Sequence, residues 1–224
     1  KKLYTQTMEV FAGFVTYTDE QFGRLLDFLD DLGELDNTLI MFVSDNGASP
    51  EGGAVGSLNE FNFFNMASEN FEENLQMIDK LGSPDTYNHY AWGWAHAGNT
   101  PFRRWKRETY RGGVSDPCMV FWPEGIKASG ELRTQYAHAV DLVPTVLDAL
   151  DIKAPEMIRG VPQSPIQGLS FAHSFDNAAA ESNHHTQYFE MFGNRAIYHQ
   201  GWFARTIHKA PWEAHPRRGL REDT

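Results

Sequence analysis

The chain has 224 residues and a formal net charge of −11 at neutral pH, with 41% apolar and 22% charged residues. This length and composition fit one globular domain, or one domain with a smaller appendage, and exclude wholesale disorder. The negative charge disfavours a nucleic-acid-binding surface. No apolar run approaches the roughly 20 residues that a membrane-spanning helix needs. We therefore expect neither nucleic acid nor a membrane among the partners.

Cys118 is the only cysteine, so an internal disulfide framework is excluded. A lone cysteine favours a reducing, cytoplasmic compartment, while a periplasmic location stays open. The sequence opens at Lys1 without a methionine, and a helical pattern starts almost at once. We therefore expect a fragment of a longer protein, for which the absence of a signal peptide is uninformative. Its oligomeric state is open.

The first half of an α/β repeat is predicted near the amino terminus. Apolar residues recur at helical spacing from about Thr5 to Leu32, which indicates a long amphipathic helix with one buried face. A short connection then leads into Thr38–Val43, an apolar and β-branched run typical of a buried strand. Helix, short loop and buried strand together are typical of α/β proteins.

This strand stops at Ser44-Asp45-Asn46-Gly47. If the strand is parallel and central, its carboxyl end lies where open α/β sheets bind their ligands. A carboxylate beside an amide oxygen suits a hard divalent cation such as calcium or magnesium, so Asp45 and Asn46 are candidate metal ligands. The alternative is a simple turn after the strand, because Asn-Gly favours turns.

Residues 47–100 show no sustained periodicity, apart from a short helix within 69–81. A connection of this length in a compact domain is usually functional or disordered, and we interpret it as an active-site insertion. Its second half is rich in imidazole and aromatic side chains suited to lining a pocket, namely His89, Tyr90, Trp92, Trp94 and His96. For each of these residues, ordinary packing is the alternative.

A basic stretch follows in an otherwise acidic chain. Five cations fall within nine positions: Arg103, Arg104, Lys106, Arg107 and Arg111. Lysine and arginine side chains hold sulfate or phosphate groups, so an anion-binding site is one interpretation. The other is a solvated basic face that balances nearby acids.

The remaining pattern predicts a second strand, a second helix and a small sheet. Cys118–Trp122 is the strand, and we expect Cys118 to be buried within it and inert. The helix runs from about Asp141 to Leu150, and the proline-rich residues 153–168 form a surface excursion. Three short strand-like runs then predict an antiparallel meander, at 187–192, 196–199 and 202–207.

Several of these segments together resemble the sulfatase family. The strand ending in Ser44-Asp45-Asn46-Gly47 is similar to the family's strand-plus-metal segment, and 99–113, with Lys106 and Tyr110-Arg111-Gly112-Gly113, is similar to its Lys-x-x-x-Tyr-x-Gly-Gly region. Residues 138–145 match the family's helix opening, and 167–170 and 187–193 look like arylsulfatases in particular. The segments occur in the expected order along nearly the whole chain.

This resemblance implies an α/β class, as part of an alkaline-phosphatase-like sulfatase fold with a mixed sheet flanked by helices and a small C-terminal antiparallel sheet. Residues 1–152 would be the C-terminal part of the catalytic α/β domain, and 153–224 a connecting excursion plus an incomplete antiparallel subdomain. It further implies that Asp45 and Asn46 ligate a divalent metal, usually calcium. Lys106 would contact the sulfate group of a small sulfate ester as a catalytic and substrate-binding residue, and His96 is a candidate on the substrate side.

The family's Cys-x-Pro-x-Arg motif, whose cysteine becomes the formylglycine nucleophile, does not occur, since Met119-Val120-Phe121 follows Cys118. We expect that motif upstream, and we expect this chain alone to be inactive and to expose apolar faces of a partial sheet. Two alternatives stay open: a phosphonate or phosphodiester hydrolase of the same superfamily, and a non-catalytic domain that kept the fold.

Overall fold

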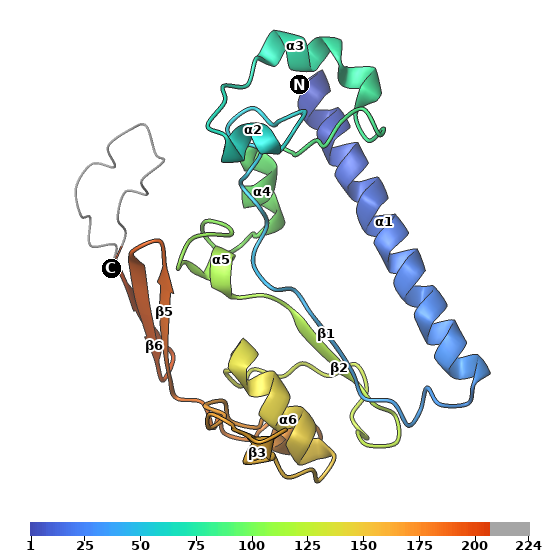
Figure 1. Cartoon of the computed structure of the whole chain (residues 1–224), viewed down its shortest axis with the longest axis vertical. Coiled ribbons are helices and arrows are strands. Elements are labelled where there is room, and N and C mark those ends of the chain that lie inside the picture. The colour runs from blue at the N-terminus through green and yellow to red at the C-terminus, as the bar shows by residue number, and fades with distance from the viewer. Residues whose placement is uncertain (207–224) are drawn as a thin grey trace.

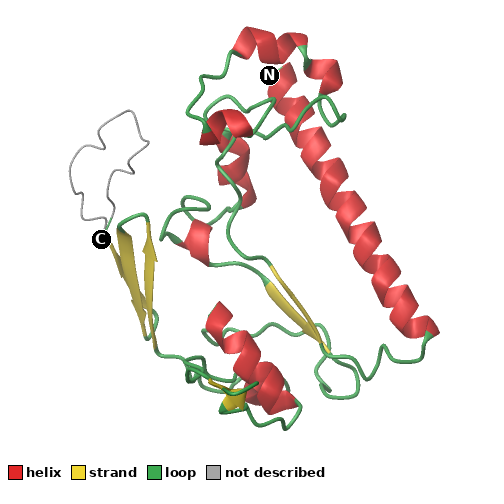
Figure 2. Cartoon of the chain, in the orientation of Figure 1, coloured by secondary structure: helices red, strands yellow, loops and turns green. Residues whose placement is uncertain are grey.

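In the computed structural model, residues 1–206 are described (Figure 1). The end of the predicted third meander strand at Ile207 and the rest of the predicted C-terminal subdomain, 207–224, lie outside these residues. Helices and strands are joined by long connections, which Figure 2 shows in green. The pair β1–β2 runs through the middle of the molecule, between the long helix α1 and the sheet that contains β5 and β6 (Figure 1).

Helix α1 spans Lys2–Asp31 and confirms the predicted amphipathic helix. Its amino-terminal part packs on the rest of the chain: the Trp94 indole N–H donates to the Tyr4 carbonyl at 2.8 Å, and the Phe11 ring meets the Tyr90 ring edge-on. The expected buried face is mostly open, because only Leu3 and Thr7 of this helix are buried. No helix within residues 1–206 is both long and apolar enough to cross a bilayer.

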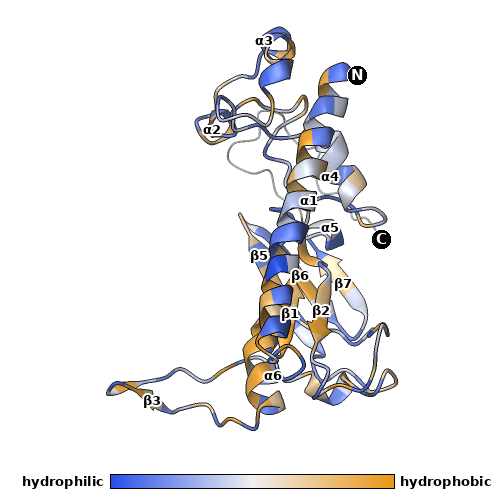
Figure 3. Ribbon diagram, turned by 90° about the vertical axis from the view of Figure 1, so that its right-hand side faces the viewer, coloured by the Kyte–Doolittle hydropathy of each residue, from blue (hydrophilic) through white to orange (hydrophobic). Residues whose placement is uncertain are grey.

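Strand β1 (Ile40–Val43) pairs with β2 (Cys118–Phe121) in an antiparallel register that sets Val43 opposite Cys118. The parallel neighbour assumed for β1 from the sequence does not occur among the described residues. The predicted burial of Cys118 was wrong: its side chain is exposed. The physical reason is that β1–β2 is an isolated two-stranded sheet with little covering it, so Met119 is also 59% exposed. Figure 3 shows apolar colour on β1, β2 and α6.

The predicted insertion is ordered around short helices. These are α2 (Phe61–Phe64), α3 (Phe71–Gln76) with a 3-10 turn at Ile78–Lys80, α4 (Trp92–Gly98) and, starting at the last cation of the basic stretch, α5 (Arg111–Val114). Isolated bridges tie its two sides together, from Ser57 to His89 and from Asn59 to Tyr87. The small core of the molecule gathers here, since Tyr90, Ala91, Ala95 and Tyr110 are all buried.

The C-terminal part confirms the predicted helix and meander. A 3-10 turn at Ala139–Asp141 leads into α6 (Leu142–Ala149), which carries Pro144 in its first turn. Two short strands follow, β3 (Met157–Ile158) and β4 (Val161–Pro162), and then a 3-10 turn at Ala172–Ser174. The meander is β5 (Thr186–Met191), β6 (Asn194–His199) and β7 (Trp202–Arg205).

Both meander turns have two residues with positive φ, Phe192-Gly193 and Gln200-Gly201. Two-residue turns of this kind match the twist of an antiparallel pair, which explains the tight register of the three strands.

Candidate functional site

The candidate site lies at the end of β1, where the loop after this strand runs beside the segment that precedes β2. The Ser44 N–H donates to the Pro117 carbonyl, and the Gly47 N–H donates to the Gly113 carbonyl, both at 3.3 Å. A Cβ at Gly47 would stand 1.7 Å from the Gly112 carbonyl oxygen. Only glycine therefore permits this approach of the two segments, which holds Asp45 and Asn46 at the end of the sheet.

Asp45 is exposed and Asn46 is half-buried at this strand end. The Asn46 side-chain N–H₂ donates to the Gly47 carbonyl at 3.2 Å, which leaves the Oδ1 atom for another partner. Asn46 lines a cavity of about 270 Å³ together with Ser44, Tyr90, Trp94 and Asp116. The two residues thus offer oxygen atoms of the kind that hard cations bind.

Asp116 is a site residue that the sequence analysis missed. The register of β1 and β2, continued by two residues beyond Val43 and Cys118, places Asp45 opposite Asp116. Burial of the Asp116 carboxyl raises its pKa to about 6, and the negative charge of Asp45 adds to the effect. Prediction of the antiparallel pairing would have found Asp116, because the pairing alone brings the two aspartates together.

These oxygens fit a divalent cation in chemistry but form only part of a coordination sphere. Calcium takes six to eight oxygen ligands, with carboxylates and amide carbonyls prominent among them. Within residues 1–206, no group of three or more His, Cys, Asp or Glu side chains is placed to hold a metal. A cation here would relieve the repulsion between Asp45 and Asp116, and other ligands would have to complete its shell.

The basic stretch lies against the same strand-end loop. The Lys106 N–H donates to the Ala48 carbonyl at 3.1 Å. The Asn99 side chain links the two loops, since its oxygen accepts from the Ala48 N–H at 2.9 Å and its amide donates to the Arg104 carbonyl at 2.9 Å. The metal-ligand candidates and Lys106, which lie about sixty positions apart in the sequence, are therefore on adjoining loops.

The Lys106 side chain forms an ion pair with Glu51, a second residue that the sequence analysis did not single out. The Lys106 ammonium lies 3.1 Å from Glu51 Oε2, and the Arg107 Nε lies 3.0 Å from Glu51 Oε1. Burial alone would raise the pKa of Glu51, but the Ser49 hydroxyl and the two cations outweigh it and hold this pKa below its usual value. Glu51 is therefore ionised at neutral pH. No sequence signal marks it, because it lies in an aperiodic loop.

Three other cations of the stretch, Arg104, Arg107 and Arg111, contact aromatic rings. The Arg111 guanidinium lies 4.1 Å from the centre of the Phe102 ring, and Arg104 lies over both Trp105 and Tyr110. Arg107 also lies over Phe63 at 4.8 Å. The stretch is thus not simply a solvated basic face, and Lys106 is the cation that it sets beside the strand-end loop.

His96 lies on α4 with its side chain exposed. Its helix neighbours Trp94 and Gly98 line the cavity beside Asn46, whereas His96 does not. The structure therefore brings Asp45, Asn46 and Lys106 to adjoining loops and leaves His96 apart from them. A substrate-side role for His96 stays a prediction.

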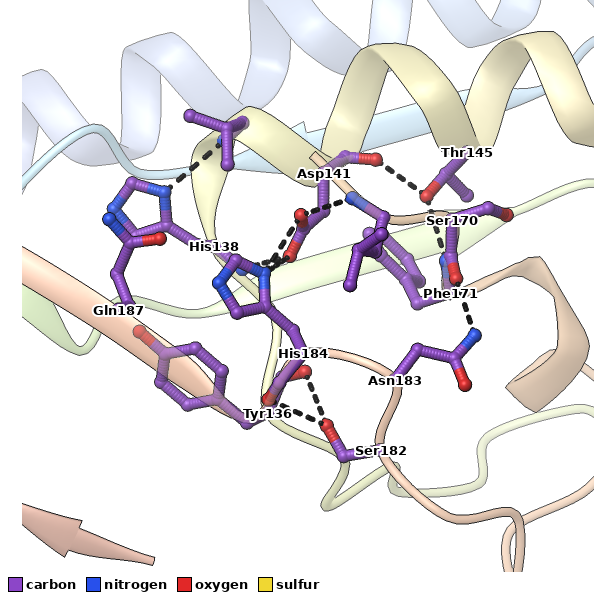
Figure 4. Close-up of polar contacts among 12 residues, drawn as sticks. Tyr136, His138, Asp141, Thr145, Ser170, Phe171, Ser182, Asn183, His184 and Gln187 are labelled. Carbon is purple, nitrogen blue, oxygen red and sulfur yellow. Dashed lines mark hydrogen bonds and ion pairs between the residues drawn. The ribbon is translucent and has the colours of Figure 1, made fainter. Parts of the chain in front are cut away.

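A separate buried polar network fixes α6 to the C-terminal part (Figure 4). Asp141, which is 1% exposed, accepts hydrogen bonds from the backbone N–H groups of His138 and Leu169, each at 2.8 Å. Its carboxylate also lies 2.7 Å from the His184 Nδ1 atom. Tyr136 stacks on Tyr198 with ring centres 3.7 Å apart. The segments 138–145 and 167–170 that resemble the family thus form one structural unit.

A sequence model of the Sulfatase family matches residues 1–152, so the chain belongs to the Sulfatase family. The α/β fold class expected from the resemblance is thereby confirmed. The chain is 31% identical over 155 residues to an uncharacterized sulfatase of Schizosaccharomyces pombe, a match that covers 69% of this chain and 27% of that protein.

It is also 25% identical over 173 residues to an arylsulfatase of Klebsiella aerogenes, covering 77% of this chain and 35% of the relative. An N-acetylglucosamine-6-O-sulfatase of Bacteroides thetaiotaomicron is 28% identical over 163 residues, covering 73% of this chain and 20% of the relative. The chain therefore matches about a third or less of the length of these relatives.

Proposed function

We propose that this chain contributes the metal-binding and sulfate-binding loops of an arylsulfatase-type sulfuric ester hydrolase. One observation carries the proposal: the Asn99 side chain and the Ala48–Lys106 backbone bond join the Asp45-Asn46 loop to the loop that bears Lys106. Oxygen ligands and a lysine on adjoining loops suit a substrate whose reacting group is a small anion.

Each residue has a distinct role in this proposal. Asp45 and Asn46 hold the cation, expected to be Ca²⁺, and Asp116 is close enough in the register to join them. The bound cation would supply Lewis-acid stabilisation of negative charge. Lys106 binds the sulfate group through its ammonium, which offsets charge on the sulfuryl oxygens as the ester bond breaks.

The nucleophile belongs to another part of the protein in this proposal. Cys118 is the only cysteine of the chain and lacks the Cys-x-Pro-x-Arg context, so the formylglycine is expected upstream. We accordingly expect no turnover from these 224 residues alone. A small-molecule sulfate ester is the expected substrate, and a cytoplasmic or periplasmic location is compatible with it.

The test compares four substrates with the same leaving group: 4-nitrophenyl sulfate, 4-nitrophenyl phosphate, bis(4-nitrophenyl) phosphate and 4-nitrophenyl phenylphosphonate. They are assayed with this chain and with the protein expressed from its full coding sequence, each with and without CaCl₂. We expect Ca²⁺-dependent hydrolysis of the sulfate, by the longer protein only. Preference for a phosphorus ester would favour the phosphonate or phosphodiester hydrolase instead. No turnover of any of them would favour the non-catalytic domain.

A further inference from the structure

Glu51 is a nearly fully buried carboxylate that contacts the proposed sulfate-binding lysine. Glu51 is 3% exposed, while the Lys106 side chain is 34% exposed. The buried partner is thus the fixed one, and the ammonium remains reachable from solvent. Each Glu51 oxygen meets a different cation, Oε2 with Lys106 and Oε1 with Arg107.

The loop that carries Glu51 is anchored on its other side. The Ser49 hydroxyl donates to Glu51 Oε2 at 2.7 Å, and the Glu51 N–H donates back to the Ser49 hydroxyl oxygen at 3.3 Å. The Trp92 indole N–H donates to the Pro50 carbonyl at 2.7 Å, which ties the loop to the start of α4. The Glu51 carboxylate therefore has a defined position before any ligand arrives.

We propose that Glu51 is the positioning residue of the anion site, which holds the Lys106 ammonium in place for a sulfate group. The inference rests on the proposed function. A lysine side chain is a flexible stem with three N–H donors, and the pair with Glu51 uses one of them. Two donors remain for sulfuryl oxygens, and the rotamer freedom of the stem is restricted before the ester binds.

The local charge remains favourable to an anion. Two cations, Lys106 and Arg107, share one carboxylate, so the three side chains together carry a single positive charge. Glu51 therefore orders the cations without cancelling them. The opposite role is also testable: a carboxylate that competed with sulfate for Lys106 would weaken anion binding, and its removal would then strengthen binding.

The experiment uses Glu51→Gln, which keeps the side-chain shape and removes the charge, and Glu51→Asp, which keeps the charge. Glu131→Gln is the matched control, because it removes an exposed carboxylate paired with Arg133 at 2.9 Å. Ser49→Ala is a milder variant that leaves Glu51 charged and removes the two hydrogen bonds through the Ser49 hydroxyl, for use if Glu51→Gln does not fold.

The first readout is the mobility of the Lys106 side chain, measured by ¹³Cε NMR relaxation in this chain without ligand. The exposed Lys127 serves as the internal reference. Lys106 is expected to be more ordered than Lys127 in the wild type and in Glu131→Gln, and as mobile as Lys127 in Glu51→Gln. An unchanged Lys106 signal in Glu51→Gln would overturn the positioning role.

The second readout is 4-nitrophenyl sulfate turnover by the protein expressed from its full coding sequence. Glu51→Gln is expected to raise KM about tenfold with a smaller change in kcat, Ser49→Ala to raise KM two- to threefold, and Glu51→Asp to recover part of the loss. A lower KM in Glu51→Gln would overturn the proposal in favour of competition. Absence of wild-type turnover would instead contradict the proposed function, and the NMR result separates the two failures.

Discussion

Asp45 and Asp116 lie opposite each other where the antiparallel pair β1–β2 ends, and Asp116 carries a pKa raised to about 6. Burial is the main cause, and the charge of Asp45 is the second. Two neighbouring carboxylates that repel each other are a destabilising arrangement unless a cation lies between them. This relationship gives the site a pH dependence that can be measured.

The pH dependence follows from the direction of the Asp116 shift. The folded chain holds the Asp116 proton up to its raised pKa of about 6, whereas the unfolded chain loses it near the ordinary aspartate pKa of 3.8. The folded state thus binds more protons between these values, so the free energy of unfolding falls as pH rises through this window. Asp116→Asn should remove this loss and stabilise the chain above pH 6, with no effect below about pH 4.

We expect Asp116→Asn to raise the free energy of unfolding at pH 7 by roughly 1–2 kcal/mol. This is less than the ~3 kcal/mol that the full pKa difference would give, because water screens the half-buried carboxyl. Urea unfolding at pH 4 and pH 7 measures it. Asp36→Asn, at an exposed position in the turn before β1, is the control. Equal stability of wild type and Asp116→Asn at pH 7 would show that the two aspartates do not repel each other in solution.

Removal of Asp45 should weaken cation binding. A partial oxygen site in this chain should bind Ca²⁺ with a Kd of about 10⁻⁴–10⁻³ M, in the range of weak calcium modules. Asp45→Asn should raise this Kd at least tenfold, and Asn46→Ala less, because it removes a neutral ligand. Isothermal titration with CaCl₂ measures both, with Asp36→Asn as the control. Identical titration curves for the wild type and Asp45→Asn would exclude this aspartate as a ligand.

The elements that could be predicted from the sequence are those whose structure depends on signals within their own residues. The amphipathic spacing of α1 and the Pro144 start of α6 are local signals, and both helices formed where they were expected. The three strands of the meander also formed in the predicted order. Asp45, Asn46 and Lys106 could be named because they lie in motifs with a fixed order along the chain.

Contacts between segments that are far apart in the chain could not be predicted from the sequence. The antiparallel pairing of β1 depends on a strand about eighty residues away, so neither Asp116 nor the exposure of Cys118 could be read from periodicity. Glu51 was missed for a similar reason: its role depends on a contact with Lys106 across fifty-five positions. A carboxylate in an aperiodic loop gives no signal until its partner is known.

Lys106 should be required for turnover of sulfate esters. Lys106→Met in the protein expressed from its full coding sequence should lower kcat/KM by about 10²–10³, the usual effect of losing one group that stabilises developing charge. Lys106→Arg should keep only part of the wild-type kcat/KM, because a planar guanidinium differs in shape from an ammonium. Lys127→Met is the control on the exposed surface. Activity of Lys106→Met within twofold of the wild type would remove this residue from the site.

The buried Asp141 network should matter for stability rather than for chemistry. Asp141→Asn replaces one accepting oxygen by a donor, which then faces the N–H groups of His138 or Leu169 or the His184 ring. An unsatisfied donor at a site that is 1% exposed should cost about 2–4 kcal/mol of unfolding free energy. Urea unfolding followed by circular dichroism measures the loss.

Asp176 provides a matched control for burial. It also accepts two backbone hydrogen bonds, from Lys127 at 2.7 Å and Ala128 at 2.9 Å, but it is exposed. Asp176→Asn should therefore cost less than about 1 kcal/mol, since water can satisfy the groups that lose their partner. Equal losses for the two variants would mean that burial does not set the strength of the Asp141 network. A large loss for Asp141→Asn alone would identify this network as the link that holds α6 to the C-terminal part.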